Sequence, residues 1–182
     1  LKDNLKSDTK YNHLLRIALN KKTLSISLRK RIKPKLNFYL KLVNLKRQKP
    51  EFKNLKYKEI LKHLKKLDNS RTDIGLCSNN KIFETGTSNL LFVKNDKVFS
   101  PLNKFYKGIT YKFFRSKIKK IIKKDILVNS LKEFDEIILI GSGKGVASVK
   151  SINQIKWKRK SLKFYNILSK HYKSAVKNCK KI

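Results

Sequence analysis

Acidic residues are scarce in this sequence, which has 12 Asp and Glu against 47 Lys and Arg. Cysteine is also sparse, and the two thiols, Cys77 and Cys179, form neither a metal-binding spacing nor a disulfide framework. No apolar run is long enough to span a bilayer, and the first ten residues lack the apolar segment of a signal peptide. We therefore expect a cytoplasmic protein with reduced thiols and no membrane partner. The three scattered histidines predict no metal site.

The formal net charge is +35, which favours affinity for phosphate polymers or acidic membranes. A bias of the whole amino-acid composition toward Lys, Asn and Ile would explain the same net charge without any such partner. The lysines occur along the whole chain, the aromatic residues are not spaced as a stacking platform, and no nucleic-acid-binding motif is present. We therefore expect no specific nucleic acid partner. A basic nucleic-acid-binding protein remains the alternative, and it predicts binding that survives physiological salt.

A chain of 182 residues is most simply one domain. It begins with Leu1, so we expect a fragment or a processed chain. Residues 1–13 are polar and are predicted to be disordered or a linker remnant. Residues 14–182 are predicted to form the single domain.

Alternating or continuous apolar residues predict many short strands. Leu14–Leu19, Thr23–Leu28 and Leu36–Val43 indicate a meander, and the continuous apolar run of Glu136–Ile140 is typical of a central strand. The Asn79-Asn80 and Asn95-Asp96 pairs favour hairpin turns. The other predicted strands are Asp73–Ser78, Ile82–Glu84, Asn89–Val93, Lys97–Ser100, Ile126–Val128, Val146–Ile152 and a pair near Trp157.

Three helices are predicted from apolar residues at helical spacing. They are Asn54–Leu67, a helix from Gly108 to about Lys124, and Ser161–Asn178 with Ser161 as its N-cap. Strands and helices do not alternate strictly along the chain. The order therefore predicts an α+β (mixed α/β) fold with helices packed around a mixed sheet.

Glu84 lies where an apolar strand meets a small polar corner, Glu84-Thr85-Gly86-Thr87-Ser88-Asn89. In a chain with so few acids, a carboxylate at this point indicates either a functional acid or a solvated loop residue. The segment Lys81–Ser100, which holds this corner and the predicted strands on either side of it, is the part of the sequence around which the other predictions are arranged.

Two turns have the character of anion sites. Gly141-Ser142-Gly143-Lys144-Gly145 follows the apolar strand and frees backbone N–H groups, although it matches neither a P-loop nor a dinucleotide fingerprint. Gly108-Ile109-Thr110 begins a helix, where free N–H groups and the helix dipole favour phosphate. The alternatives are a plain tight turn at 141–145 and a Thr110 that only caps its own helix.

Lysine reacts with aldehydes only when part of its population is neutral, which requires nearby cations or desolvation. Lys53 precedes the first predicted helix in Phe52-Lys53-Asn54-Leu55-Lys56-Tyr57. Among so many lysines, the residues alone do not single it out.

The combination of these segments resembles the class IV aminotransferases, the fold-type-IV pyridoxal-phosphate enzymes. The matching segments, in order, are Lys53–Tyr57, Glu84–Phe92, Gly108–Thr110 and Asp135–Ser142, and the resemblance runs from about Leu14 to Val149. This family includes branched-chain and D-amino-acid aminotransferases and aminodeoxychorismate lyase. A match of Lys33 or Lys35 to the family lysine is rejected because the family has one helix and one strand between its lysine and its acid.

The resemblance implies a branched-chain-aminotransferase-like enzyme with pyridoxal 5'-phosphate as cofactor and an amino acid or 2-oxo acid as substrate. Lys53 matches the lysine that forms the internal aldimine and shuttles the α-proton, and Glu84 matches the acid that pairs with the pyridinium nitrogen. The other implied cofactor-binding residues are Ile109 and Thr110 at the helix start, Ser142 and Gly143 in the second phosphate turn, and Tyr57 near the phenolic oxygen. A homodimer is implied in the same way.

The sequence departs from the family at several points. Lys56 replaces a usual Asn, Tyr111 replaces a usual Arg, and Lys144 replaces a small residue. Full members also carry an N-terminal domain, which we expect to be absent, so that residues 14–182 correspond to the C-terminal cofactor-binding domain. Two alternatives stay open: a lyase that releases pyruvate in 4-aminobenzoate and folate synthesis, and an inactive truncated domain.

Overall fold

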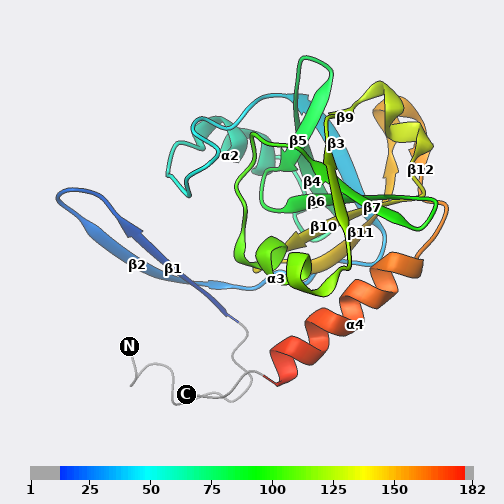
Figure 1. Cartoon of the computed structure of the whole chain (residues 1–182). Helices are drawn as coiled ribbons and strands as arrows, with labels where there is room; N and C mark the ends of the chain where they lie inside the picture. The colour runs from blue at the N-terminus through cyan, green and yellow to red at the C-terminus, as the bar shows by residue number, and fades with distance from the viewer. Residues whose placement is uncertain (1–12, 179–182) are drawn as a thin grey trace. The chain divides into compact units, whose positions relative to one another are not determined.

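The computed structural model describes residues 13–178 (Figure 1), so most of the segment expected to be disordered lies outside the described residues. The chain divides into two compact units, Leu1–Ile32 and Lys33–Ile182. Within the described residues, no helix has the length and apolar character needed to cross a membrane.

The first unit contains one antiparallel hairpin, β1 (His13–Leu19) paired with β2 (Leu24–Lys30). Because side chains alternate across a strand, the register places Leu15 opposite Leu28, Ile17 opposite Ile26, and Leu19 opposite Leu24 on one face. All six of these apolar side chains are exposed. The predicted meander is wrong, because β3 (Phe38–Asn44) pairs with strands of the second unit and not with β2.

The second unit is built on a ten-stranded mixed sheet, so the predicted α+β class is confirmed. The strand order is β8-β7-β6-β10-β11-β3-β4-β5-β9, with β12 added to β11. The bounds are β4 Thr72–Ser78, β5 Lys81–Thr85, β6 Asn89–Lys94, β7 Lys97–Pro101, β8 Ile121–Lys124, β9 Ile126–Leu127, β10 Glu136–Gly141, β11 Gly145–Ile152 and β12 Trp157–Lys158.

Local hairpins and distant pairings together form this sheet. The hairpins β4–β5 and β6–β7 turn at Asn79-Asn80 and Asn95-Asp96, and all four turn residues have positive φ, as a type I′ turn requires. Both predicted hairpins are therefore confirmed. In contrast, β3 lies parallel to both β4 and β11. The Gln154 side chain reinforces the second pairing, since it accepts from the Leu42 backbone N–H at 2.6 Å and donates to the Leu42 carbonyl at 2.8 Å.

Strand β10 shows why a continuous apolar run forms a central strand. Ile137 and Leu139 point into a core cluster that also contains Phe92, Phe134 and Trp157, among others. Ile138 and Ile140 point to the opposite face, into a second cluster beneath the helices. Both faces of the strand are buried, so the positions from Ile137 to Ile140 are apolar on both faces.

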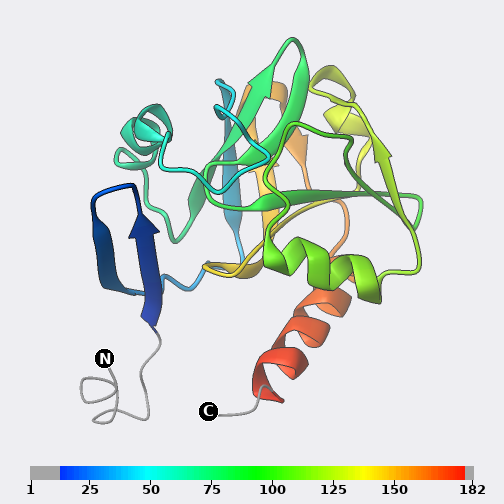
Figure 2. The same ribbon diagram turned by 60° about the vertical axis from the view of Figure 1, so that its left-hand side comes forward.

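The helices are α2 (Lys58–Leu64), α3 (Ile109–Lys117) and α4 (Lys163–Lys177), with 3-10 turns η1 (Asn129–Glu133) and η2 (Asn153–Ile155). Helices α3 and α4 cover the second core cluster, while α2 packs on β4 over a separate small cluster. In Figure 2, α2 lies at a different edge of this unit from α3 and α4. Two helix predictions need correction. The predicted helix from Asn54 begins only at Lys58, and the helix from Gly108 ends at Lys117 because Ile121–Lys124 forms β8, parallel to β7.

Helix α4 is capped from a distant strand and not by Ser161 alone. The buried carboxylate of Glu136 on β10 accepts hydrogen bonds from the backbone N–H groups of Phe164 and Tyr165 at 2.8 and 2.9 Å, and from the Ser161 hydroxyl at 3.1 Å. A negative charge at a helix N-terminus also complements the helix dipole. Glu136 is therefore the main cap of α4. The prediction of Ser161 as N-cap holds in part, since its hydroxyl accepts from the Lys163 backbone N–H at 3.0 Å although the N-cap position is Leu162.

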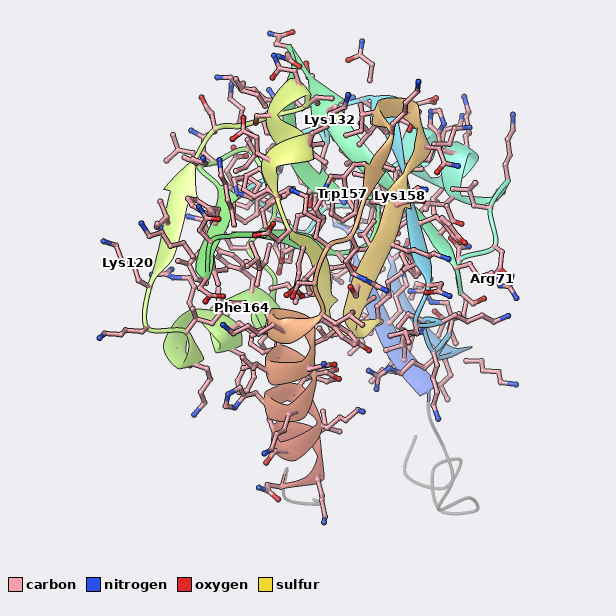
Figure 3. All side chains as sticks on the ribbon, turned by 90° about the vertical axis from the view of Figure 1, so that its right-hand side faces the viewer. Arg71, Lys120, Lys132, Trp157, Lys158 and Phe164 are labelled. Carbon is pink, nitrogen blue, oxygen red and sulfur yellow. The ribbon has the colours of Figure 1, made fainter. Side chains whose placement is uncertain are left out.

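The basic side chains surround the second unit. Figure 3 shows nitrogen-bearing side chains extending from many of its elements, including the labelled Arg71, Lys120, Lys132 and Lys158. The structure places three acids in the interior instead, namely Asp73, Glu84 and Glu136. Each of them has specific partners.

Candidate functional site

Glu84 is at the end of β5, with only 3% of its surface exposed. Its Oε1 atom accepts a hydrogen bond from Nε of Arg47 at 2.8 Å, and the two side chains form a largely buried ion pair. A terminal nitrogen of the same guanidinium donates to the Gly86 carbonyl at 3.3 Å. Glu84 is therefore not a solvated loop acid.

Burial raises the pKa of Glu84 above its ordinary value, because the charged carboxylate loses its hydration. The positive charge and hydrogen bond of Arg47 oppose this shift, as does the backbone N–H of Tyr106. The outcome is a carboxyl group whose protonation depends on the cation placed beside it.

The corner after Glu84 is held by a compact hydrogen-bond network. Thr85 is fully buried, and its hydroxyl accepts from the Ser88 backbone N–H at 2.8 Å and donates to Asp73 at 2.9 Å. The Thr87 hydroxyl donates to the same Asp73 oxygen at 2.6 Å. The small polar residues of this segment therefore fix the backbone that follows Glu84.

Asn89, the first residue of β6, joins this corner to the start of α3. Its side-chain amide donates to the Tyr106 carbonyl and accepts from the Gly108 backbone N–H at 3.1 Å. A Cβ atom on Gly108 would lie only 3.0 Å from Oδ1 of Asn89, so this close approach favours glycine. The first turn of α3 therefore lies beside the Glu84 corner.

Ile109 and Thr110, the predicted phosphate binders, form that first turn. The Ile109 side chain is 75% exposed, whereas Thr110 is buried. Within the described residues, no side chain caps this helix start. Its N–H groups thus have the character of an anion site, provided by a nine-residue helix.

The glycine-rich turn after β10 reaches the same corner from the other side. A Cβ atom on Gly141 would lie 3.1 Å from Oγ of Ser88, which shows how closely this turn passes the corner. Ser142 is exposed and Gly143 is half-buried. Gly145 has φ of 72°, a conformation that favours glycine.

The structure gives a role to Lys144, one of the residues that depart from the family pattern. Its Nζ atom lies 2.8 Å from the Thr87 hydroxyl and 3.3 Å from Asp73, and its side chain is 9% exposed. The amine also lies 5.4 Å from the centre of the Phe38 ring. This buried ion pair ties the turn at 141–145 to the corner at 84–89.

Tyr57 and Lys53 lie on the segment that precedes α2. Tyr57 lines a cavity of about 280 Å³ together with Arg47, the partner of Glu84. Lys53 is exposed, and no ion pair or side-chain hydrogen bond joins it to the Glu84 corner within residues 13–178. Lys53 lies between these two cavity residues in the chain.

The structure thus brings together Glu84, the start of α3 and the turn containing Ser142 and Gly143. Tyr57 lines one cavity with Arg47, the partner of Glu84. The structure does not bring Lys53 into a contact with them. Sequence reasoning missed Arg47 and Asp73, because only a fold places them next to Glu84 and Lys144. The available signal was the scarcity of acids in the sequence, since a buried acid in so basic a chain needs a cation beside it.

Tyr111 accounts for a second departure from the family pattern. It is fully buried, its hydroxyl lies 3.0 Å from that of Ser100, and its ring stands edge-on to Phe105. At this position the chain therefore places a core residue instead of a cation.

Comparison with protein-family models places the chain in one family. A family model described as amino-transferase class IV matches residues 2–152. No curated protein sequence matches the chain significantly. Similar solved structures include a proposed 4-amino-4-deoxychorismate lyase from Legionella pneumophila, with a TM-score of 0.76 and 17% identity over 95% of this chain and 72% of that one.

Two branched-chain aminotransferases are also similar. The enzyme from Thermoproteus uzoniensis, solved with norvaline, gives a TM-score of 0.70 and 16% identity over 88% of this chain and 60% of that one. The enzyme from Thermobaculum terrenum, in its pyridoxal-phosphate form, gives 0.69 and 15% over 88% and 61%. At these identities the likeness shows a shared fold, and the chain spans 60 to 72% of the length of these proteins.

Proposed function

Because this chain belongs to the class IV aminotransferase family, which depends on pyridoxal phosphate, we propose that it binds this cofactor and transfers amino groups. The substrates in this proposal are an amino acid and a 2-oxo acid, as in a branched-chain aminotransferase. The observation that carries it is the buried Glu84, whose pKa is raised, beside a helix start and a glycine-rich turn.

The chemistry of these groups fits the cofactor. Pyridoxal phosphate, when bound, supplies an electron-accepting ring that stabilises negative charge at the substrate α-carbon. Glu84 would hold a proton at the pyridine nitrogen, and Arg47 would keep the carboxylate charged and oriented. Arg47 is a positioning residue in this scheme, since it acts through Glu84.

The phosphate would bind between the helix start and the glycine-rich turn. The N–H groups of Ile109 and Thr110 and the dipole of α3 favour the dianion. The Ser142 hydroxyl and the Gly143 backbone would contribute from the other side. The Lys144–Asp73 pair would keep the second turn beside the corner.

Lys53 would supply the amine that holds the cofactor and moves the α-proton. The chain on either side of it, at Arg47 and Tyr57, lines the 280 Å³ cavity. In this scheme the segment 45–57 brings the amine of Lys53 toward the Glu84 corner, and Tyr57 contacts the phenolic oxygen.

Borohydride reduction after incubation with pyridoxal phosphate tests this assignment. Peptide mapping should find one stoichiometric label on Lys53, and Lys53→Ala should abolish it. Lys56→Ala and Lys58→Ala are matched controls on the same segment and should label normally. Labelling spread over many lysines, or a full label in Lys53→Ala, would exclude Lys53 as the attachment site.

The reaction type is tested by product analysis. Amino-group transfer predicts glutamate formation from 2-oxoglutarate and a branched-chain amino acid. Release of pyruvate from aminodeoxychorismate would instead assign the lyase reaction. A chain that labels at Lys53 and yields neither product would be an inactive domain.

A homodimer completes the proposal. The β1–β2 hairpin exposes the cross-strand pairs Leu15–Leu28, Ile17–Ile26 and Leu19–Leu24, and a contiguous apolar face of this kind is typical of a protein contact. Ile17→Lys combined with Ile26→Glu should shift sedimentation toward the monomer. Thr23→Lys with Ser25→Glu, at exposed polar positions, is the control and should leave the sedimentation unchanged.

A further inference from the structure

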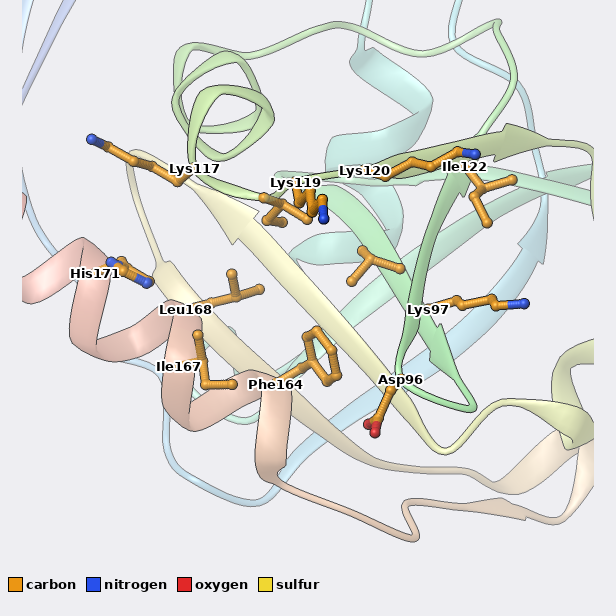
Figure 4. A pocket seen from close by; sticks show the side chains of 12 residues that line it. Asp96, Lys97, Lys117, Lys119, Lys120, Ile122, Phe164, Ile167, Leu168 and His171 are labelled. Atoms are coloured by element: carbon orange, nitrogen blue, oxygen red, sulfur yellow. The ribbon is translucent and has the colours of Figure 1, made fainter.

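A cavity of about 640 Å³ lies between α4, the end of α3 and the strands β7 and β8 (Figure 4). This volume is within the range of small-molecule sites in proteins. The phosphate-binding residues proposed above are at the N-terminus of α3, whereas this cavity is at the C-terminus of that helix. Nine residues at the rise of an α-helix separate the two ends by about 13 Å.

The cavity has a continuous apolar floor. Six side chains from four parts of the fold contribute to it: Val98, Ile118, Ile122, Phe164, Ile167 and Leu168. A bias toward lysine does not produce such a floor. Of the six, Val98 and Leu168 are buried and Ile167 is 43% exposed, so the floor is open to a ligand at one side.

One wall of the cavity is fixed by the fold. Phe164 is in the first turn of α4, and its backbone N–H donates to the buried Glu136 carboxylate at 2.8 Å. Leu168, one turn further on, is anchored in the core cluster beneath α3 and α4. The site is therefore preformed, which lowers the entropic cost of binding.

The rim of the cavity is cationic. Lys97, Lys117, Lys119 and Lys120 line it, and none of them has a carboxylate partner within residues 13–178. The single acid in the lining, Asp96, is already paired with Lys163 at 2.7 Å. Lys117 also complements the dipole of α3, but Lys97, Lys119 and Lys120 lie outside that helix. The rim therefore carries four lysines without a carboxylate partner in the described part of the chain and one acid that is already paired.

We propose that this cavity binds a small amphipathic anion, a carboxylate on a medium-length acyl or aryl body. The apolar body lies on the floor formed by Phe164, Ile167 and their neighbours. The carboxylate lies at the lysine rim, near Lys119 and Lys120. This inference does not depend on the proposed cofactor chemistry, because it uses none of the same residues.

Titration calorimetry with decanoate tests the proposal on the intact chain. We expect one site per chain, with affinity that falls as salt rises from about 20 mM to about 300 mM, because the rim charges are screened. Decanol, which lacks the charge, should bind about tenfold more weakly, and decyltrimethylammonium should not bind. Excess pyridoxal phosphate should not displace decanoate.

Paired variants separate this cavity from general basicity. Ile167→Glu should abolish binding, whereas Val176→Glu, an equal change at an exposed position elsewhere on α4, should leave it unchanged. Lys119→Gln with Lys120→Gln should weaken binding about tenfold. Lys112→Gln with Lys173→Gln removes the same charge away from the cavity and should change the affinity less than about twofold.

Three results would overturn the proposal. These are equal affinity for decanoate and decanol, equal loss in both lysine pairs, and binding that Ile167→Glu does not affect. Circular dichroism and thermal unfolding establish that each variant is folded. If Ile167→Glu does not fold, Ile167→Gln takes its place. Ile167→Gln should then weaken binding at least several-fold, because it removes apolar contact area.

Discussion

Arg47 and Glu84 are separated by 37 residues in the chain, yet the Arg47 guanidinium opposes the rise in pKa that burial causes at the Glu84 carboxyl. A buried carboxylate without a cation tends to take up a proton. A buried guanidinium without an anion is left as an uncompensated charge, which destabilises the fold. The pair is therefore the residue-scale feature on which both folding and the proposed function depend.

Replacing Arg47 with Met should raise the pKa of Glu84 further, because only desolvation and the Tyr106 N–H then act on the carboxyl. A carboxyl with a raised pKa in the folded state adds stability below its ordinary pKa, and that contribution is lost as pH rises through the raised value. The destabilisation by Arg47→Met should therefore be small in acid and reach about 3 kcal/mol near neutrality. Urea unfolding across pH and carbon NMR of the Glu84 carboxyl measure both effects.

The double variant Arg47→Met, Glu84→Gln is the matched control. It leaves no unpaired buried charge, so it should recover most of the stability lost at neutral pH. A single variant with the same unfolding free energy as the wild type at every pH would show that the pair is not coupled.

Cys77 should be unreactive in the folded protein. Burial raises the pKa of its thiol to about 12, so almost no thiolate exists near neutrality. In a Cys179→Ser background, a disulfide reagent should modify Cys77 only after denaturant is added. Fast labelling in native buffer would contradict the buried position of this side chain in β4.

At the scale of elements, the first turn of α4 depends on a side chain from β10. Glu136→Ala would remove the acceptor of two backbone N–H groups and a hydroxyl, and should cost about 2–3 kcal/mol. Glu136→Gln keeps one acceptor oxygen and should cost less. Urea unfolding measures the cost, and hydrogen exchange at the Phe164 and Tyr165 amides shows whether it is local.

Glu133→Ala is the control for this prediction. Glu133 is an exposed acid three positions earlier, paired with Lys94 at the surface, and its loss should matter little. Equal effects of the two alanine variants would indicate a general charge effect, not loss of the cap.

The elements also show what a sequence can predict. The type I′ hairpins at Asn79-Asn80 and Asn95-Asp96 and the buried strand β10 follow from local signals: turn residues that accept positive φ, and a run that is apolar at every position. The end of α3 does not follow. Ile118, Ile121 and Ile122 keep helical spacing, and β8 forms only because β7 offers an edge for parallel pairing.

The candidate site divides in the same way. Glu84 and the turns at 108–110 and 141–145 could be named from short motifs, because each motif is contiguous. Arg47 and the Asp73–Lys144 pair could not, since they are made by strands and loops that meet only in the fold. Lys53 was named only through a family resemblance, and its role is still a prediction.

For the whole molecule, a net charge of +35 implies strong self-repulsion in the compact state. Raising sodium chloride from about 50 mM to about 500 mM should therefore raise Tm by several degrees, because the Debye length shortens severalfold. Thermal unfolding followed by circular dichroism measures this.

Guanidinium chloride and urea provide the control for that prediction. Guanidinium chloride is itself a salt, so its extrapolated unfolding free energy should exceed the value from urea. A Tm that stays constant or falls with salt would mean that surface ion pairs outweigh the repulsion.

The pairing of β3 with β11 has a consequence for synthesis. Leu42 and Gln154, which clamp these strands together, are 112 residues apart. At about 5 to 20 residues per second, a ribosome needs roughly 6 to 22 seconds to make the intervening chain. Throughout that interval β3 has one unpaired edge and the apolar side chains Phe38 and Leu40, so nascent chains on neighbouring ribosomes are exposed to pairing with one another. Slower translation would lengthen this exposure. A chaperone that binds β3 until β11 has been synthesised would prevent pairing between nascent chains.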